Sequence, residues 1–307
     1  QANRLETLSV SRGEQDPELA LLLGLHAVGE TRRAGEEPTP AALSALHRAI
    51  LSPPPVAAWR PHGNAYVVNV LFAPDGRTVY TLGQSEVAQT DVDTGRRVRA
   101  YSAPGTGAVY GLALSRNGRW LALGRDDRQA FLFELATGRL VRSFGGFGLY
   151  VRAVAFSPDS TRLALSSLDG TIQLWAVPEL RKVAEWNQGT SIWRMTFSPD
   201  GRFLLTSGSR GGARLWDLTG GGAGREARRF AHDDAAVPGV AWSPDGRWIA
   251  TGSADTTVKL WDGATGEWRR TLHGHRDSVE DVVFSADSRQ LASSSDDKTA
   301  RVWQVES

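Results

Sequence analysis

The sequence has no cysteine, one methionine and only three lysines among its 307 residues. Without cysteine, the chain can form no disulfide, no thiolate metal site and no cysteine nucleophile. No stretch approaches the ~18 consecutive apolar residues of a membrane-spanning helix, so we expect no membrane segment. The formal net charge of +1 disfavours nucleic acid as a partner. With 41% apolar residues the chain can still build a sizeable core.

What the chain does contain is eleven tryptophans and a repeat. A polar turn similar to Ser-Pro-Asp-Gly occurs six times, always directly after an apolar residue. The residues directly before the turn are Phe72, Leu114, Phe156, Phe197, Trp242 and Phe284. They are spaced by 42, 42, 41, 45 and 42 residues. Proline and Asp-Gly both favour β-turns, so each copy predicts a hairpin.

Each repeat alternates apolar and polar residues with the period of two that is typical of half-buried strands. Three strands surround and follow the turn, and a fourth ends at an aromatic or aliphatic residue before the next copy. Four antiparallel strands in about 42 residues are the pattern of one β-propeller blade. We therefore predict an all-β fold over residues 53–307, a six-bladed β-propeller with four antiparallel strands per blade.

The ends of the repeat region predict how the ring closes. The sixth copy stops at Val305, after its third strand, whereas residues 55–61 resemble a fourth strand. We expect residues 55–61 to complete the last blade, because closure pairs strand edges that would otherwise stay exposed.

Residues 253–257 (Ser-Ala-Asp-Thr-Thr) and 295–299 (Ser-Asp-Asp-Lys-Thr) are each followed by a strand with tryptophan, at Trp261 and Trp303. Together with Gly274-His275, this pattern resembles the WD-repeat family. The resemblance covers residues 55–307 and weakens toward the N-terminus. It implies a propeller whose partners are proteins or peptides.

The resemblance also implies a role for one set of polar residues. In the WD-repeat family, the matching positions form a buried network of hydrogen bonds within a blade. The residues at these positions in the sixth repeat are His275, Ser293, Asp297 and Trp303. Partial copies of the network are expected at Asp255 with Trp261 and at Asp169 with Trp175.

The same residue types also occur in a serine hydrolase triad. A working triad needs an exposed nucleophile and oxyanion donors, whereas a buried imidazole and indole need partners for structural reasons alone. We therefore expect no catalytic residue and no enzyme. Hydrolase activity at the central channel of the propeller is the alternative.

No cofactor or metal is expected. The only lysine followed by serine or threonine is Lys298, which Asp297 precedes, so the chain has no phosphate-binding loop. Of the six histidines only His273 and His275 are close neighbours, and two residues at a strand end do not make a metal site.

Binding residues are sought where the repeat varies. In WD-repeat proteins, the start of each first strand lies on the top face near the central channel. This position holds Tyr110, Arg152, Trp193 and Glu280 in four of the repeats. A second top-face position holds Asp126 and Arg210. Because tyrosine, tryptophan and arginine are enriched at binding hot spots, we predict a protein or peptide ligand there. Packing at the channel mouth is the alternative.

Residues 1–52 differ from the repeats. Asp16-Pro17-Glu18 and Thr39-Pro40 are helix-start signals, so we predict a short α-helical adaptor segment. Residues 16–23 and 45–49 resemble helices that precede propellers in bacterial multidomain signalling and defence proteins of the signal-transducing ATPase type.

This resemblance implies an upstream effector domain in a cytoplasmic protein, with the propeller as its sensor. Arginine supplies 32 of the 35 basic residues, a bias that favours a GC-rich bacterial genome. The alternative function is a structural assembly scaffold.

Overall fold

A computed structural model describes residues 61–62, 67, 69–220 and 224–306 of the chain. In this part of the chain 23 strands form six antiparallel sheets, and no helix is present. No segment of it is therefore a helix that could span a membrane. The expected all-β class is confirmed for the described residues.

The strands of each sheet follow one another in the sequence. The first sheet contains β1 (Asn69–Phe72), β2 (Thr78–Leu82), β3 (Glu86–Asp91) and β4 (Arg97–Ser102). The second contains β5 (Val109–Leu114), β6 (Trp120–Arg125), β7 (Ala130–Glu134) and β8 (Leu140–Phe144). The third contains β9 (Val151–Phe156), β10 (Arg162–Ser167), β11 (Thr171–Ala176) and β12 (Arg181–Asn187).

The remaining three sheets have the same order. The fourth contains β13 (Met195–Phe197), β14 (Phe203–Thr206), β15 (Ala213–Asp217) and β16 (Arg225–Phe230). The fifth contains β17 (Gly239–Trp242), β18 (Trp248–Gly252), β19 (Val258–Asp262) and β20 (Trp268–Leu272). The sixth contains β21 (Val279–Phe284), β22 (Gln290–Ser295) and β23 (Ala300–Gln304).

The recurring turn joins the first two strands of each sheet. In the third sheet, the Ser157 hydroxyl donates to the Asp159 carboxylate over 2.5 Å, and this carboxylate accepts the backbone N–H of Thr161. Ser160 takes the left-handed conformation that glycine supplies in other copies. The side-chain hydrogen bonds fix the hairpin, and with it the register of the strands on either side.

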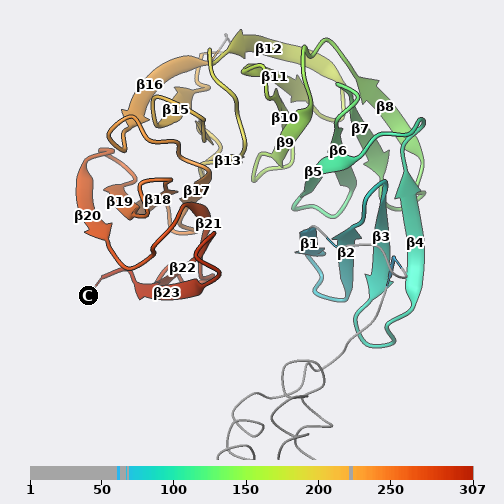
Figure 1. Ribbon diagram of the computed structural model, residues 1–307. Helices are drawn as coiled ribbons and strands as arrows, with labels where there is room; N and C mark the ends of the chain where they lie inside the picture. Colours follow the sequence, from blue (N-terminus) through green and yellow to red (C-terminus); the bar gives the residue numbers. More distant parts are fainter. Residues whose placement is uncertain (1–60, 63–66, 68, 221–223, 307) are drawn as a thin grey trace, which may run out of the picture. The chain divides into compact units, whose positions relative to one another are not determined.

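The core lies between neighbouring sheets. The first strand of each sheet is innermost, and the fourth is outermost in the five sheets that have one. The sheets follow chain order around a common centre (Figure 1). Trp120 and Phe144 of the second sheet, for example, share a buried cluster with Val151 and Trp175 of the third. The middle strands are apolar and almost fully buried because sheets cover them on both faces.

The first and sixth sheets each have one described sheet as a neighbour, and this leaves apolar side chains exposed. Val302 of β23 is 66% exposed, whereas Leu260, at the same position of the fifth sheet, is 1% exposed. Phe72 at the end of β1 is exposed, whereas its counterpart Phe197 is buried. The expected closing strand at residues 55–61 lies, apart from residue 61, outside the described residues. The helices expected in residues 1–52 lie outside them too.

Candidate functional site

A buried network of hydrogen bonds joins the four residues expected in the sixth sheet. The imidazole of His275 is 2.9 Å from the Asp297 carboxylate through Nδ1 and 2.8 Å from the Ser293 hydroxyl through Nε2. The indole N–H of Trp303 donates to the same hydroxyl over 2.8 Å. Hydrogen bonds from Thr299 and His275 hold the pKa of Asp297 below its usual value. Ser293 is buried and has an indole and an imidazole as partners, so it offers no exposed nucleophile.

The fifth sheet contains the same network in full. His232 is 2.8 Å from Asp255 and 2.7 Å from the Thr251 hydroxyl, and the Trp261 indole donates to Thr251 over 2.9 Å. The sequence predicts Asp255 and Trp261 for this network, with His232 as a plausible counterpart of His275, which follows it by 43 residues, and the structure confirms all three. Thr251 was not predicted, although it precedes Ser293 by 42 residues.

The third sheet differs from the expected pattern. No histidine precedes β9, and Gln173 fills the space instead: its amide oxygen accepts the Trp175 indole N–H over 3.1 Å, and its amide nitrogen donates to the Gly145 carbonyl. Asp169 instead accepts the backbone N–H groups of Gly148 and Thr171. Asp169 and Trp175 thus belong to separate sets of hydrogen bonds.

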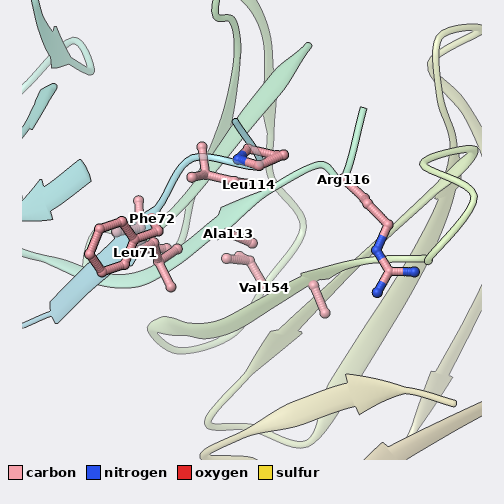
Figure 2. A pocket seen from close by; sticks show the side chains of 9 residues that line it. Leu71, Phe72, Ala113, Leu114, Arg116 and Val154 are labelled. Atoms are coloured by element: carbon pink, nitrogen blue, oxygen red, sulfur yellow. The ribbon is translucent and has the colours of Figure 1, made fainter. Parts of the chain in front are cut away.

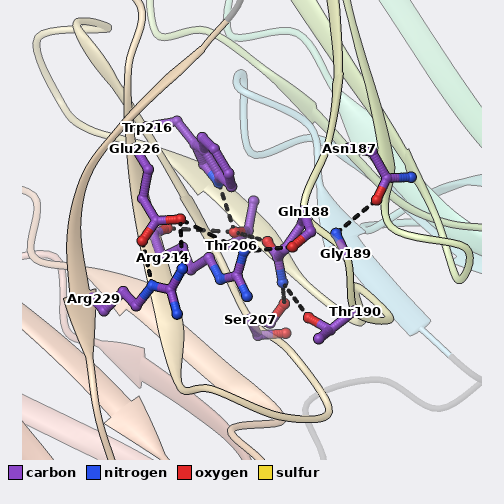
Figure 3. A network of polar contacts seen from close by, with 10 residues as sticks. All are labelled: Asn187, Gln188, Gly189, Thr190, Thr206, Ser207, Arg214, Trp216, Glu226 and Arg229. Atoms are coloured by element: carbon purple, nitrogen blue, oxygen red, sulfur yellow. Dashed lines mark hydrogen bonds and ion pairs between the residues drawn. The ribbon is translucent and has the colours of Figure 1, made fainter.

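In the fourth sheet, Gln188 stands where the fifth and sixth sheets have histidine (Figure 3). The Thr206 hydroxyl donates to the Gln188 amide oxygen over 2.5 Å and accepts the Trp216 indole N–H over 2.9 Å. The buried Arg214 guanidinium donates to the Gln188 carbonyl and lies 3.5 Å from Glu226. Burial lowers the pKa of Arg214. Each of these networks satisfies buried polar groups of one sheet and of the segment before its first strand, which is a structural role.

We expect His232 to make the stability of the protein dependent on pH. Burial lowers the pKa of His232 below its usual 6.5, although Asp255 opposes this shift. The unfolded chain therefore binds a proton at a pH where the folded chain does not, and stability falls as the pH drops through about 6.5. We expect His232→Gln to lose less unfolding free energy than the wild type between pH 7 and pH 5 in urea titrations. The exposed His273→Gln should behave as the wild type, and equal losses in all three proteins would contradict the prediction.

A cavity of about 1280 Å³ lies among the innermost strands. Four of the six residues selected as binding residues line it, and we call them the central site: Tyr110, Arg152, Trp193 and Glu280. They come from the start of β5, from β9, from the segment before β13 and from β21. Because the flanking residues of β5 and β9 are buried between sheets, the alternate residues Tyr110 and Arg152 face the centre.

Asp126 and Arg210 do not line this cavity. Asp126 lies in the turn between β6 and β7, and Arg210 lies between β14 and β15. The structure therefore brings together the residues of the first-strand position and leaves those of the second position outside the cavity.

Most charged groups of the cavity already have partners. Arg194 and Asp281 form an ion pair of 2.9 Å. Burial raises the pKa of Asp281, and Arg194 opposes that rise. Glu280 accepts the hydroxyl of Ser278 over 2.7 Å. Arg152 is exposed and has no hydrogen bond or ion pair through its side chain with any residue that the structure describes.

An aromatic pair lies beside Arg152. The rings of Tyr110 and Tyr150 are stacked, with centroids 6.0 Å apart and planes 12° apart. Both side chains are about half exposed, at 47% and 44%. The sequence did not predict Tyr150 as a binding residue. Tyr150 precedes β9 and stands two residues before Arg152, which occupies the variable position of the first strand.

A second, smaller cavity of about 520 Å³ lies at the other end of β1 and β5, beside the turns (Figure 2). Leu71, Phe72, Leu114 and Arg116 line it, together with Val154 of β9. It contains no residue of the central site. Its lining residues come from the first, second and third sheets. The described residues contain no cluster of three or more histidine, aspartate or glutamate side chains that could hold a metal ion.

Comparison with known families gives one match. A sequence model of the WD domain, G-beta repeat, matches five segments, namely residues 95–134, 138–176, 181–217, 224–262 and 266–304. The first match begins at the outer strand of the first sheet, β4, and ends with the third strand of the second sheet, β7. The sequence repeat is thus shifted by one strand from the structural sheet, and β1 to β3 lie outside the matches.

Curated relatives share the repeats over part of their length. The chain is 28% identical over 141 residues to "Protein groucho" of Drosophila melanogaster, covering 45% of this chain and 19% of the relative. It is 33% identical over 95 residues to "Small ribosomal subunit protein RACK1y" of Oryza sativa subsp. japonica, covering 31% and 28%. It is 41% identical over 102 residues to "WD repeat-containing protein 1" of Mus musculus, covering 32% and 17%.

The alignments thus span less than a third of each of these relatives. The five matched segments, in contrast, make up more than half of this chain, and they coincide with sheets that carry the expected hydrogen-bond networks. The chain therefore belongs to the WD-repeat family.

Proposed function

We propose that this chain is a non-catalytic protein–protein interaction module whose partner binds at the central site. The proposal rests on one cavity, to which three strands and the segment before β13 each contribute a residue of the central site. These residues are Tyr110, Arg152, Trp193 and Glu280. Large, partly exposed aromatic side chains with an arginine are the residue types that dominate binding energy at interfaces. A cavity at the centre of a repeat ring suits a peptide or loop of a partner.

The polar groups that resemble a catalytic triad support the non-catalytic part of the proposal. The hydroxyl of Ser293 is buried between an imidazole and an indole, so it lacks the accessible position that a nucleophile needs. Turnover of an ester or peptide substrate by the purified chain, abolished by Glu280→Gln, would contradict a purely binding role.

The proposal predicts loss of partner capture when the aromatic groups of the central site are removed. We expect the double variant Tyr110→Ala/Trp193→Ala to retain less than a tenth of the partner that the wild-type chain retains from extracts of its native host. Quantitative mass spectrometry of the retained proteins measures this. Trp268→Ala is the matched control, because Trp268 is an exposed tryptophan on the outer strand β20.

Unchanged capture by the double variant would contradict binding at the central site. Equal loss in Trp268→Ala would place binding on the outer strands instead. Stable oligomers of the purified chain in light scattering, without added partner, would favour the alternative of a structural scaffold.

The wider context of the chain is a separate proposal. We propose that it is the sensor end of a larger bacterial signalling or defence protein in the cytoplasm, with an effector domain upstream. The support is the likeness of residues 16–23 and 45–49 to helices that precede propellers in such proteins. The sequence of the parent gene upstream of residue 1 tests it: no effector domain there would contradict it.

A further inference from the structure

We infer that the central site selects an acidic segment of its partner, with a carboxylate on Arg152 and an adjacent apolar side chain on the Tyr110–Tyr150 pair. The inference rests on the proposed function and adds the chemistry of the partner. It depends on three features: the charges of the cavity, the tyrosine pair that reaches the cavity through Tyr110, and the separation of Arg152 from Glu280 across the common centre.

The first feature is the state of the charged groups. Arg194 is held by Asp281 at 2.9 Å, so it is not available to a ligand without breaking that pair. Arg152 also lines the cavity and is exposed, and its side chain has no partner among the described residues. An exposed guanidinium without a hydrogen-bond or ion-pair partner can bind a carboxylate through two parallel hydrogen bonds.

The second feature is the position of the aromatic pair. Arg152 is the second residue of β9 and lines the cavity together with Tyr110, and Tyr150 directly precedes this strand. The ring of Tyr150 in turn stacks on Tyr110 of β5. Neither tyrosine hydroxyl has a hydrogen bond to another described residue, so both remain free to bind. Two rings that hold each other in place lose little conformational entropy when a ligand packs on them.

The third feature separates acidic from basic ligands. Glu280, the carboxylate of the cavity that forms no ion pair, belongs to β21 in the sixth sheet, whereas Arg152 belongs to β9 in the third. The two strands lie on opposite sides of the common centre (Figure 1). A basic group bound to Glu280 would therefore lie away from the Tyr110–Tyr150 pair, whereas a carboxylate on Arg152 would lie near it. This difference favours an acidic ligand.

The experiment is a selection from a random dodecapeptide library displayed on phage, with the purified chain as bait. We expect aspartate and glutamate to be enriched about threefold over the unselected library, next to an aliphatic or aromatic residue. A synthetic copy of the selected peptide should bind Arg152→Ala about tenfold more weakly in fluorescence anisotropy. Arg152→Glu should select lysine and arginine instead.

Arg289→Glu is the matched control, because Arg289 is an exposed arginine of the turn between β21 and β22 and the change in charge is the same. It should keep the acidic preference. Two outcomes would overturn the inference while leaving the proposed function intact. In the first, the selected peptides need Tyr110 for binding but show no charge preference. In the second, Arg152→Glu still selects acidic peptides. Failure to select any peptide that depends on Tyr110 would contradict both. Thermal unfolding of each variant, within a few degrees of the wild type, shows that it is folded.

Discussion

Replacing Trp261 with alanine is expected to lower the free energy of unfolding by about 3–5 kcal/mol. The indole is 8% exposed and lies edge-on to Phe230 of the fourth sheet, with ring centroids 5.2 Å apart. It therefore joins two sheets, and its N–H donates to Thr251. Alanine removes the apolar contact with the neighbouring sheet and leaves the Thr251 hydroxyl one partner short. Urea unfolding, followed by far-ultraviolet circular dichroism, measures the loss.

Two further variants separate the contributions. Trp268→Ala changes the same residue type in the same sheet, but this side chain is 57% exposed, so we expect a change within about 0.5 kcal/mol. Trp261→Phe keeps most of the apolar contact and removes only the hydrogen bond, and should cost about 1–2 kcal/mol. A loss in Trp268→Ala as large as in Trp261→Ala would show that burial between sheets is not the cause.

The sequence alone was sufficient to predict the strands and the sheets that the described residues form. The reason is physical: each sheet must bury both faces of its middle strands, so apolar residues recur with a strict period. The turn after each first strand needs residues that favour a β-turn, such as Pro158 and Asp159 in the third copy, and these turn residues mark the register. The same period placed Tyr110 and Arg152 at equivalent positions, and these two residues do line one cavity.

The sequence could not predict the hydrogen bonds in which another residue type takes the place of histidine. Gln188 replaces histidine in the fourth sheet, and Gln173 accepts the indole N–H of the third. Both can donate and accept hydrogen bonds, so the geometry of the site, and not the residue type, decides which one is used. Tyr150 was missed for another reason: its contact with Tyr110 joins two sheets, and a comparison of repeats one at a time does not show contacts between them.

Gly212 is the second position where a small change should have a large effect. It directly precedes β15, two residues after Arg210, and has a φ of +76°, a backbone conformation that alanine adopts only with strain. A Cβ atom there would also overlap the backbone carbonyl of Phe230 on the neighbouring strand β16. Neither the glycine nor the strand beside it can move without breaking the pairing of Ala213 with Phe230. We therefore expect Gly212→Ala to cost about 3 kcal/mol or more in urea unfolding.

Gly118 separates the two causes of that cost. Its φ of +68° is close to that of Gly212, but an added Cβ would have no heavy atom within 4 Å. Gly118→Ala should therefore show the backbone strain alone, about 1 kcal/mol. The difference between the two variants measures the close approach of β16 to the hairpin. Equal losses of unfolding free energy in the two variants would mean that the backbone conformation alone requires glycine at residue 212. A larger loss in Gly212→Ala, which we expect, would show that packing against β16 holds the hairpin with Arg210 in place.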